Sequence, residues 1–365
     1  MYSACFDHLV LLAPGPAGST GGGIRRIELP HDAGSPLARF AAGLLGRDPA
    51  ILRRLAPGVK TVLSVVRDVA RTHAEVTVLY EDLVTAGGLA ELRSSHLQVR
   101  TIARCHNVLG EVFEGLGRGV ARIPWAWERG RIRRFERQTV HRLDRVWTLS
   151  GRDAEEVLRR YGRAPDGVLP VAIDVDRYGG VPPGDPSTVV HVGSADLRKG
   201  HGLRWFLDAV WPDVRLAAPD ARLVLAGRGT ERLRRDAAGV SGLGFVEDDR
   251  EVLRRGTVFV NPQQVGSGVK IKSLVAMAAA RCLVTTPKGV EGIAVHPRVH
   301  CHVEQDAQAM AARIVEAVGA PARALAVGRA GRQFVSAAHA PEVVMAAGKR
   351  LLDPGLSGAR TAPRG

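Results

Sequence analysis

The placement of lysine is the first chemical signal in this 365-residue sequence. Only six of the 51 basic residues are lysine, and four of those six lie in glycine-rich loops that follow apolar, strand-like runs. They are Lys199, Lys270, Lys272 and Lys288. A lysine ammonium is a compact point charge that suits phosphate at close range, whereas the arginine guanidinium is planar and larger. The pattern favours a site for a diphosphate.

Two glycine turns follow predicted strands in the second half of the chain. One strand-like run ends at Gly193, and the basic pair Arg198 and Lys199 comes just before a predicted helix. Backbone N–H groups at the start of a helix, together with a nearby lysine, form an anion site. The next run ends in Gly227 and Arg228, where the glycine lets the backbone approach a ligand. Each turn alone is a weak signal, because turns before helices often contain glycine and lysine.

A third loop carries the richest motif. Gly266, Ser267 and Gly268 precede a predicted helix whose first turns carry Lys270 and Lys272. Negative phosphate oxygens can face both the free amides of the turn and the two ammonium groups. This loop is therefore a candidate phosphate cradle.

The elements that must position these loops alternate along the chain. Short apolar runs alternate with amphipathic helical stretches, which predicts parallel sheets with helices on both faces. The predicted strands are 8–12, 75–80, 98–103, 145–149, 167–171, 189–192, 222–226, 240–246, 258–260 and 282–285. The predicted helices include 51–71 (broken near Pro57), 122–142, 154–161, 203–210, 251–255, 269–280, 307–318 and 342–352.

Length and turn residues predict two domains. At about 150 residues per domain the chain makes two, and the glycine- and proline-rich stretch 174–188 predicts a linker between them. The fold class is α/β, with two Rossmann-like, doubly wound domains that face across a cleft, where the carboxyl ends of the strands bind ligands. The predicted divisions are an N-terminal domain at 1–175, a hinge at 176–187, a second domain at 188–340, a helix at 341–354 that returns to the first domain, and a tail at 355–365.

Two alternatives remain for the start of the chain. Either residues 10–23 form the first strand and a glycine-rich loop, or the strand at 9–12 is a later one and the first β-α unit is absent. The strand-like alternation at 24–30 and the following prolines favour the second alternative.

Composition excludes several classes of protein. With 45% hydrophobic and 24% charged residues, the chain is ordinary for a globular protein. Its four cysteines lie far apart without a C-x-x-C pair, which argues against a zinc site or a disulfide scaffold and favours a reducing, cytoplasmic setting. No apolar run approaches the ~18 residues of a membrane span, and the N-terminus lacks a signal-peptide pattern.

The net charge of +14 indicates either an anionic partner or simply an arginine-rich composition. The basic stretch 118–137 contains Trp125 and Trp127. This combination is typical of a helix that docks peripherally on anionic lipid headgroups, and equally of a solvated helix whose tryptophans lie in the core. The sequence does not predict a nucleic-acid partner, because no reader module accompanies the charge.

Several motifs are better explained without chemistry. Asp174 and Asp176 have the spacing of a D-x-D metal clamp, but they lie in the predicted hinge, and no other cluster has metal-ligand spacing, so no metal is expected. The absence of a G-x-G-x-x-G after the first strand argues against a nicotinamide enzyme. Cys105 lies beside His106, but adjacent residues of an extended segment point in opposite directions, which favours a structural cysteine.

Five motifs lie in order between residues 191 and 292. They are V-G-x5-K-G at 192–200, W-P-x-V-R-L-x2-P-D-A-R-L-V-L-A-G-R-G at 211–229, G-F-V-E-D at 244–248, G-S-G-V-K-I-K-x2-V-A-M-A at 266–278 and T-P-K-G-V-E-G at 286–292. In order and spacing this block resembles the donor-binding domain of the GT-B retaining glycosyltransferases. That group 1 family includes bacterial mannosyl-, glucosyl- and N-acetylglucosaminyltransferases and glycogen-synthase-like enzymes. A thinner likeness, including R-C-H-N at 104–107, extends over most of the chain from about residue 75.

The resemblance implies retaining transfer of a hexosyl group from a nucleotide-sugar to an acceptor hydroxyl, without a metal or a cofactor. The leaving diphosphate helps to deprotonate the acceptor in this family, so stabilising that diphosphate is the main catalytic contribution. His106 would lie near the reacting sugar. The implied catalytic residues are His106, Lys199 and Lys272, and the implied donor-binding residues are Gly193, Arg198, Lys199, Gly227, Arg228, Gly266, Ser267, Gly268, Lys270 and Lys272.

Three positions depart from the family pattern. Val275 stands where relatives usually have the glutamate that bonds the nucleotide ribose, Ser267 where many have a second glutamate, and Ser194 where an arginine is frequent. A lost hydrogen bond of this kind removes about 0.5–1.5 kcal/mol of binding free energy. The alternative function is therefore that of a degenerate relative without turnover, which acts as a binding or partner subunit.

Overall fold

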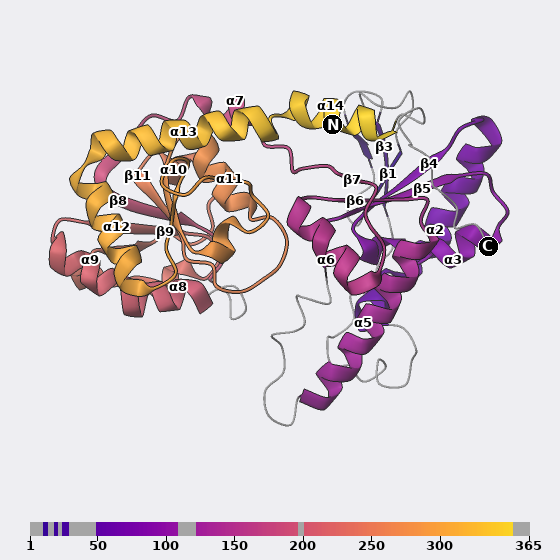
Figure 1. Cartoon of the computed structure of the whole chain (residues 1–365), viewed down its shortest axis with the longest axis horizontal. Coiled ribbons are helices and arrows are strands. Elements are labelled where there is room, and N and C mark those ends of the chain that lie inside the picture. The colour runs from indigo at the N-terminus through magenta and orange to yellow at the C-terminus, as the bar shows by residue number, and fades with distance from the viewer. Residues whose placement is uncertain are drawn as a thin grey trace. The chain divides into compact units, whose positions relative to one another are not determined.

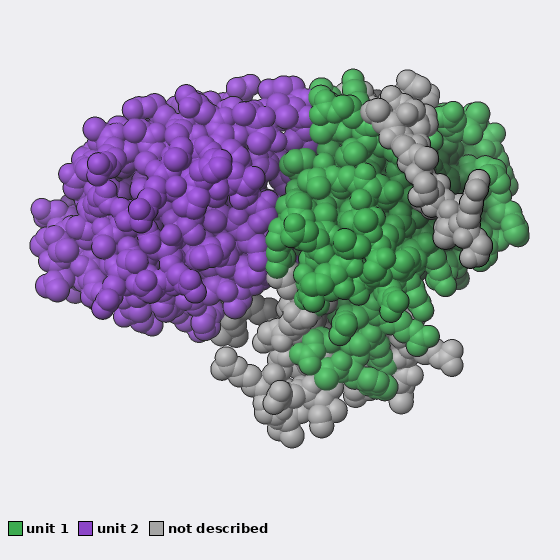
Figure 2. All heavy atoms as spheres, viewed as in Figure 1, with its two compact units in different colours: residues 1–170, 345–365 green, residues 171–344 purple. Residues whose placement is uncertain are grey.

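The structure is a computed structural model that describes residues 10–13, 18–20, 24–28, 49–108, 122–195 and 201–352. The chain divides into two compact units (Figure 2). Unit 1 comprises residues 1–170 and 345–365, and unit 2 comprises residues 171–344.

Unit 2 is built on a sheet of six strands whose neighbours all run parallel. The strands are β8 (Asp185–Val192), β9 (Arg222–Ala226), β10 (Val240–Gly242), β11 (Gly256–Asn261), β12 (Cys282–Thr285) and β13 (His302–Val303). Their order in the sheet is β10-β9-β8-β11-β12-β13. This doubly wound order reverses direction between β8 and β11, and ligands of such sheets bind at the carboxyl ends of the strands beside that reversal.

Helices cover both faces of this sheet (Figure 1). One core lies under α8 (His201–Trp205), the π-helical turn η4 (Phe206–Val210), α9 (Trp211–Ala217) and α12 (Ala307–Gly319). The other lies under α7 (Val175–Gly179), α10 (Arg250–Leu253), α11 (Ile271–Ala278) and α13 (Pro321–His339). Single 3-10 turns are η5 (Thr230–Leu233), η6 (Asp236–Ala238) and η7 (Pro287–Val290). Because both faces are covered, the strands are continuous apolar runs, and all six residues of β11 are buried.

Unit 1 contains a parallel sheet of four strands in the order β4-β5-β6-β7. These strands are β4 (Thr77–Glu81), β5 (Arg100–Cys105), β6 (Arg145–Thr148) and β7 (Gly167–Val168). The helical elements of unit 1 are α2 (Ala50–Thr72), η2 (Leu83–Ala86), α3 (Leu89–Ser94), α5 (Arg122–Arg142) and α6 (Gly151–Tyr161), and α14 (Pro341–Leu352) ends in it. α6 begins where the Ser150 hydroxyl accepts a hydrogen bond from Asp153 N, and it ends at Gly162 in the left-handed conformation.

The start of the chain differs from both alternatives that the sequence left open. β1 (Val10–Ala13), β2 (Gly18–Thr20) and β3 (Ile24–Glu28) form a separate three-stranded sheet, in which β3 pairs parallel with β1 and antiparallel with β2. The strand predicted at 8–12 is therefore not a strand of the four-stranded sheet. Its partner is the alternating run that follows it, and sequence periodicity does not specify which strand pairs with which.

The hinge predicted at 176–187 lies inside unit 2. Its first residues belong to α7, and the Arg281 guanidinium donates to the carbonyls of Val181 and Pro182, both at 3.0 Å. Glycine and proline therefore mark a bonded connection on unit 2 here rather than a linker. The break predicted at Pro57 is also wrong, since α2 continues through that proline.

Candidate functional site

The turns that follow β8 and β9 pack directly against each other at the carboxyl edge of the unit 2 sheet. Gly227 has φ of 128°, and a Cβ at this position would lie 2.3 Å from the Gly193 carbonyl oxygen. Ala195 N donates to the Arg228 carbonyl at 2.9 Å, which joins the two turns. Only glycine fits between them, because a side chain would meet both a positive φ and the neighbouring backbone.

His191, Gly193 and Lys272 meet at the end of β8. His191 is 3% exposed, and its Nδ1 lies 2.9 Å from the Val260 carbonyl oxygen of β11. A Cβ at Gly193 would lie 2.8 Å from His191 Nε2 and 2.8 Å from Lys272 Nζ. The first turn of α11 thus brings its lysine to the backbone turn after β8, beside the reversal of strand order. An ammonium and a glycine turn in this position make a candidate anion site.

The loop before α11 is held by its own lysine. Gly266 and Gly268 have φ of 116° and 71°, and the Lys270 ammonium, which is 7% exposed, donates to the carbonyls of Ser267 at 3.1 Å and Gly268 at 2.5 Å. Glu291 lies 3.7 Å from the same ammonium. Lys270 therefore shapes the loop from within, although the sequence places it beside Lys272 as a phosphate ligand.

A buried polar network fixes the end of β11. The Asn261 side chain donates to Ser273 Oγ at 2.8 Å, and Ser273 Oγ donates to the Gly289 carbonyl at 2.7 Å. Asn261 Oδ1 and Ser267 Oγ are buried without a hydrogen-bond partner, so two polar oxygens are unsatisfied in this part of unit 2. Sequence reasoning missed Asn261 and Ser273, since a single Asn or Ser at a strand end or in a helix carries no motif.

The remaining residues predicted to bind the nucleotide-sugar, together with Lys288 and Val275, do not form one cluster in the described part of the structure. Arg198 and Lys199 lie outside the described residues. Arg228 is exposed, with its guanidinium carbon 5.7 Å from the centre of the Phe245 ring. Lys288 pairs with Glu291 at 2.8 Å. Val275 packs against the apolar core that α11 covers.

The carboxyl edge of the unit 1 sheet carries acids and an imidazole. His106 Nε2 lies 2.5 Å from Glu81 Oε2 at the end of β4, and the buried Arg104 guanidinium lies 3.5 Å from the same carboxylate. The next residue, Asp82, has φ of 111°, an uncommon conformation for a residue with a side chain. Burial raises the pKa of Asp82, while hydrogen bonds from Leu83 N and Asn107 oppose that rise. Sequence reasoning did not single out Glu81 and Asp82. Only the parallel pairing of β4 with β5 brings them near His106, and local sequence does not reveal that pairing.

Two further expectations, a decoy metal motif at Asp174 and a structural role for Cys105, can be compared with the structure. Asp174 accepts a hydrogen bond from Arg177 N at 3.0 Å and so caps α7. Within the described ranges no group of three or more His, Cys, Asp or Glu side chains is placed to hold a metal ion. Cys105 is buried, and that burial raises the pKa of its thiol well above the usual value. A thiolate nucleophile is therefore unfavourable at this position.

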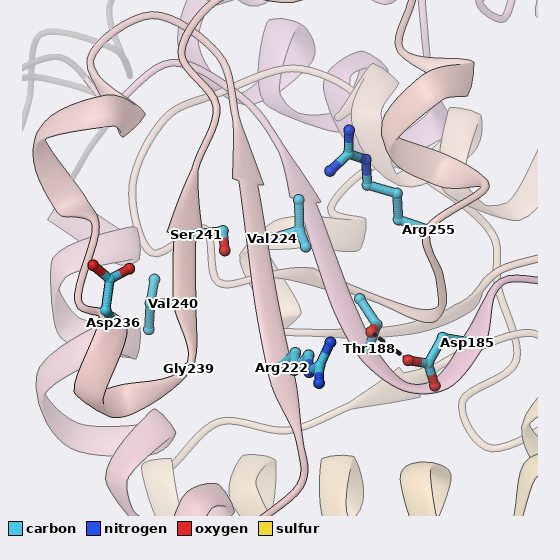
Figure 3. A pocket seen from close by; sticks show the side chains of 9 residues that line it. All are labelled: Asp185, Thr188, Arg222, Val224, Asp236, Gly239, Val240, Ser241 and Arg255. Carbon is cyan, nitrogen blue, oxygen red and sulfur yellow. Dashed lines mark hydrogen bonds between the residues drawn. The ribbon is translucent and has the colours of Figure 1, made fainter.

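A groove of about 490 Å³ lies at the opposite edge of the unit 2 sheet (Figure 3). Its walls come from the amino ends of β8, β9 and β10, and include Asp185, Thr188, Arg222 and Ser241. Asp185 bonds the Thr188 hydroxyl at 3.1 Å, so this carboxylate already has a local partner. The groove is remote from the glycine turns along the strands and is separate from the candidate anion site.

α5 presents a basic surface with one tryptophan. Its buried side includes Ile132 and Glu136, and Trp127 is 56% exposed with the Arg131 guanidinium carbon 4.4 Å from its ring centre. Arg133, Arg134 and Arg137 are exposed, and the side chain of Trp125 lies outside the described part. None of the helices in the described ranges combines the length and apolar character needed to cross a bilayer.

Comparison with known proteins agrees with this arrangement. Residues 186–319 match the family model "Glycosyl transferases group 1". Sucrose-phosphate synthase from Thermosynechococcus elongatus superposes with a TM-score of 0.68 at 17% identity, over 94% of this chain and 88% of that one. Anabaena Alr3699/HepE in complex with UDP gives 0.65 at 14% identity, over 94% and 99% of the two chains. The chain has the GT-B fold.

Two other comparisons, one with a solved structure and one with a sequence, cover less of the matched protein. TarM gives a TM-score of 0.61 at 12% identity over 75% of this chain, which spans 54% of TarM. An uncharacterized 44.6 kDa protein in the cps region of Klebsiella pneumoniae is 31% identical over 102 residues, about a quarter of its length. Within this GT-B chain the family match lies in unit 2 and contains the glycine-rich loops at 193–200, 227–229, 266–268 and 286–292.

Proposed function

We propose that this protein is a retaining hexosyltransferase, which moves a hexosyl group from a nucleotide-sugar to an acceptor hydroxyl without a metal ion. The observation that carries the proposal is the meeting of Lys272 with the Gly193 turn at the reversal of strand order in unit 2. The family match over residues 186–319 and the likeness to HepE, whose structure holds UDP, support the same class of reaction.

On this proposal unit 2 stabilises the leaving diphosphate. The Lys272 ammonium and the amides of the turn at 266–268 are proposed to face the charge that develops as the sugar–phosphate bond breaks, whereas Gly193 N and Ala195 N already donate to the carbonyls of Ala226 and Arg228. Arg198 and Lys199, which precede α8, are proposed to hold the same diphosphate. The anomeric configuration is retained if the acceptor hydroxyl attacks on the face of the sugar from which the diphosphate leaves. The departing phosphate then accepts the proton of that hydroxyl. No protein nucleophile is then needed.

Unit 1 supplies the group proposed to contact the transferred sugar. His106 is oriented by Glu81 at 2.5 Å, and Glu81 is in turn held near the buried Arg104. A carboxylate beside an imidazole fixes its orientation and favours one tautomer. Because the Glu81 carboxylate only accepts, Nε2 of the neutral ring carries the hydrogen, and the proposed role of His106 is to accept a hydrogen bond from a sugar hydroxyl at Nδ1.

The test is a panel of UDP-, GDP- and ADP-sugars, with binding measured by calorimetry and slow hydrolysis by NMR, which also reports the anomeric configuration of the product. We expect one nucleotide-sugar to be hydrolysed in the presence of EDTA, with retained configuration. Lys272→Met should weaken binding of that donor by about 100-fold, as for loss of a charged hydrogen bond. Lys60→Met, a matched change at an exposed lysine of unit 1, should have no effect. Inverted configuration or a metal requirement would contradict the proposal.

The second candidate is a binding or partner subunit without turnover. It is favoured by Val275, whose partly buried apolar side chain packs against the core of unit 2 and provides no carboxylate for a ribose. The same panel separates the two functions. Binding of a nucleotide-sugar without hydrolysis or transfer, at protein concentrations that give clear heat signals, would support the second.

The α5 surface is proposed to place the protein peripherally on an anionic membrane at the cytoplasmic face. Three exposed arginines and one exposed tryptophan match an anionic headgroup region. Each juxtamembrane basic residue contributes about 1 kcal/mol. Replacing Arg133, Arg134 and Arg137 by glutamine should therefore lower the binding constant for phosphatidylglycerol vesicles, measured by co-sedimentation, by about 100-fold. Equal binding to pure phosphatidylcholine vesicles would contradict a charge-based surface.

A further inference from the structure

We infer that His191 is a positioning residue, whose unprotonated Nε2 holds the Lys272 ammonium at the Gly193 turn. That this ammonium binds a diphosphate rests on the proposed function. The inferred contact between His191 and Lys272 does not depend on that function and can be tested without a ligand.

The His191 side chain continues the hydrogen bonding between β8 and β11 beyond the last backbone pair. The recorded pairing of β8 with β11 ends at Val190 and Phe259, one residue before His191 and Val260. Beyond that pair the imidazole itself bonds across the gap, since Nδ1 lies 2.9 Å from the Val260 carbonyl. A carbonyl oxygen only accepts, so Nδ1 carries the hydrogen. Nε2 of the neutral ring is therefore an acceptor.

The surroundings keep that ring neutral. Burial lowers the pKa of His191 to about 3, and the nearby charge of Lys272 adds to the shift. The bond to the Val260 carbonyl opposes the shift but does not reverse it. At neutral pH, Nε2 therefore presents a lone pair beside the Gly193 turn.

Gly193 shows where the lone pair and the ammonium meet. Because a Cβ at Gly193 would lie 2.8 Å from both His191 Nε2 and Lys272 Nζ, both atoms border the small space that the missing side chain leaves. An ammonium has three donors and no acceptor, so it complements an acceptor nitrogen. The lysine stem is long and flexible, and an acceptor that orients its end lowers the entropy lost when an anion binds.

The ligand-free test is ¹⁵N NMR of histidine-labelled full-length protein. We expect the His191 signals to report the neutral tautomer with hydrogen on Nδ1 at pH 7. The Nε2 resonance should move towards that of a free acceptor in Lys272→Met and stay in place in Lys60→Met. An Nε2 resonance unchanged in Lys272→Met, or a hydrogen on Nε2, would overturn the inference.

The second test uses inorganic pyrophosphate as the probe, with calorimetry. His191→Phe retains an aromatic ring beside Phe259, whose ring centre lies 6.1 Å away, but removes the lone pair. We expect it to weaken pyrophosphate binding by about 10-fold. His191→Gln, whose amide can donate to Val260 and accept from Lys272, should restore binding to within about threefold. In a Lys272→Met background, His191→Phe should have no further effect, because coupled residues are not additive.

The outcomes separate the two claims. An equal loss on His191→Phe with and without Lys272 would show a merely structural role and overturn the inference. Failure of the wild-type chain to bind pyrophosphate would count against the proposed function, and the NMR experiment would then decide the inference by itself.

Discussion

At the carboxyl edge of the unit 2 sheet, glycine turns, a lysine and backbone amides lie together, whereas the same edge of the unit 1 sheet carries Glu81, Asp82 and His106. The unit 2 edge relies on close backbone approaches that only glycine allows. The unit 1 edge relies on side chains that bond one another. Two parallel sheets, one doubly wound and one with its described strands in sequential order, thus present one edge proposed to suit an anion and one suited to orienting hydrogen bonds. On the proposed function, this division separates diphosphate stabilisation from recognition of the sugar.

The largest expected effect is from Gly227→Ala in unit 2. The new Cβ would lie 2.3 Å from the Gly193 carbonyl oxygen at a residue with φ of 128°. Strain and overpacking together should lower the free energy of unfolding by about 2–4 kcal/mol, measured by urea denaturation. The control is Gly180→Ala, where no atom lies within 4 Å of the added Cβ. A Gly227→Ala variant as stable as the control would contradict the conclusion that the turns at Gly193 and Gly227 leave no room for a side chain.

The two neighbouring lysines of unit 2 should respond differently. Lys270→Met removes the donor for the Ser267 and Gly268 carbonyls and leaves Glu291 with one fewer cation. We expect a loss of about 2 kcal/mol in unfolding free energy. Lys272→Met should lower the unfolding free energy by about 1 kcal/mol, because His191 Nε2 loses its donor, and should act mainly on anion binding. Urea denaturation beside pyrophosphate calorimetry measures both, and equal stability losses would remove the distinction.

A fall in pH should change the free energy of unfolding in opposite directions through His191 of unit 2 and Asp82 of unit 1. The pKa of His191 is about 3 in the fold against an ordinary 6.5, so below pH 6.5 the unfolded chain binds a proton that the folded chain does not. This costs about 1.4 kcal/mol of stability per pH unit as pH falls towards 3. Asp82 has a raised pKa, so its protonation favours the folded state as pH falls.

Variants make this acid dependence measurable. His191→Phe should flatten the loss of stability between pH 6.5 and pH 4.5, and Asp82→Asn should steepen it, in urea titrations at several pH values. A wild-type slope in His191→Phe would mean that this imidazole is protonated in the fold.

The smallest expected effect is from Glu81→Gln in unit 1. The amide keeps the shape of the side chain but weakens the hold on His106, which we expect to lower turnover of the identified nucleotide-sugar by about fivefold. Pyrophosphate affinity should stay unchanged, because the proposed anion site belongs to unit 2. Glu91→Gln at an exposed position of α3 is the control. A loss of pyrophosphate binding in Glu81→Gln would contradict the division between the two edges.

Much of unit 2 could be predicted from periodicity alone. The strands at 222–226 and 282–285 match β9 and β12 at both ends, because buried parallel strands are short apolar runs bounded by turn residues. Parallel strands also place their following loops at one edge, so the glycine turns at Gly193 and Gly227 could be expected to lie close together. The match to a glycosyltransferase family model falls on this same region.

Other parts of the site depended on contacts between distant residues. Lys270 and Lys272 are two residues apart and look equivalent in sequence, yet one is bonded into its own loop and the other reaches the turn after β8. The stretch 176–187 looks like a linker, yet an arginine about a hundred residues away bonds its carbonyls.

The sequence by itself determined where strands, helices and glycine turns form, because these follow from local periodicity and from backbone conformations that few residues adopt. Only the tertiary structure decided which charged and polar groups face one another: His191 with Val260 and Lys272, and Glu81 with His106. The physical reason is that strand order and helix packing set those distances, and neither is encoded in the spacing of residues along the chain.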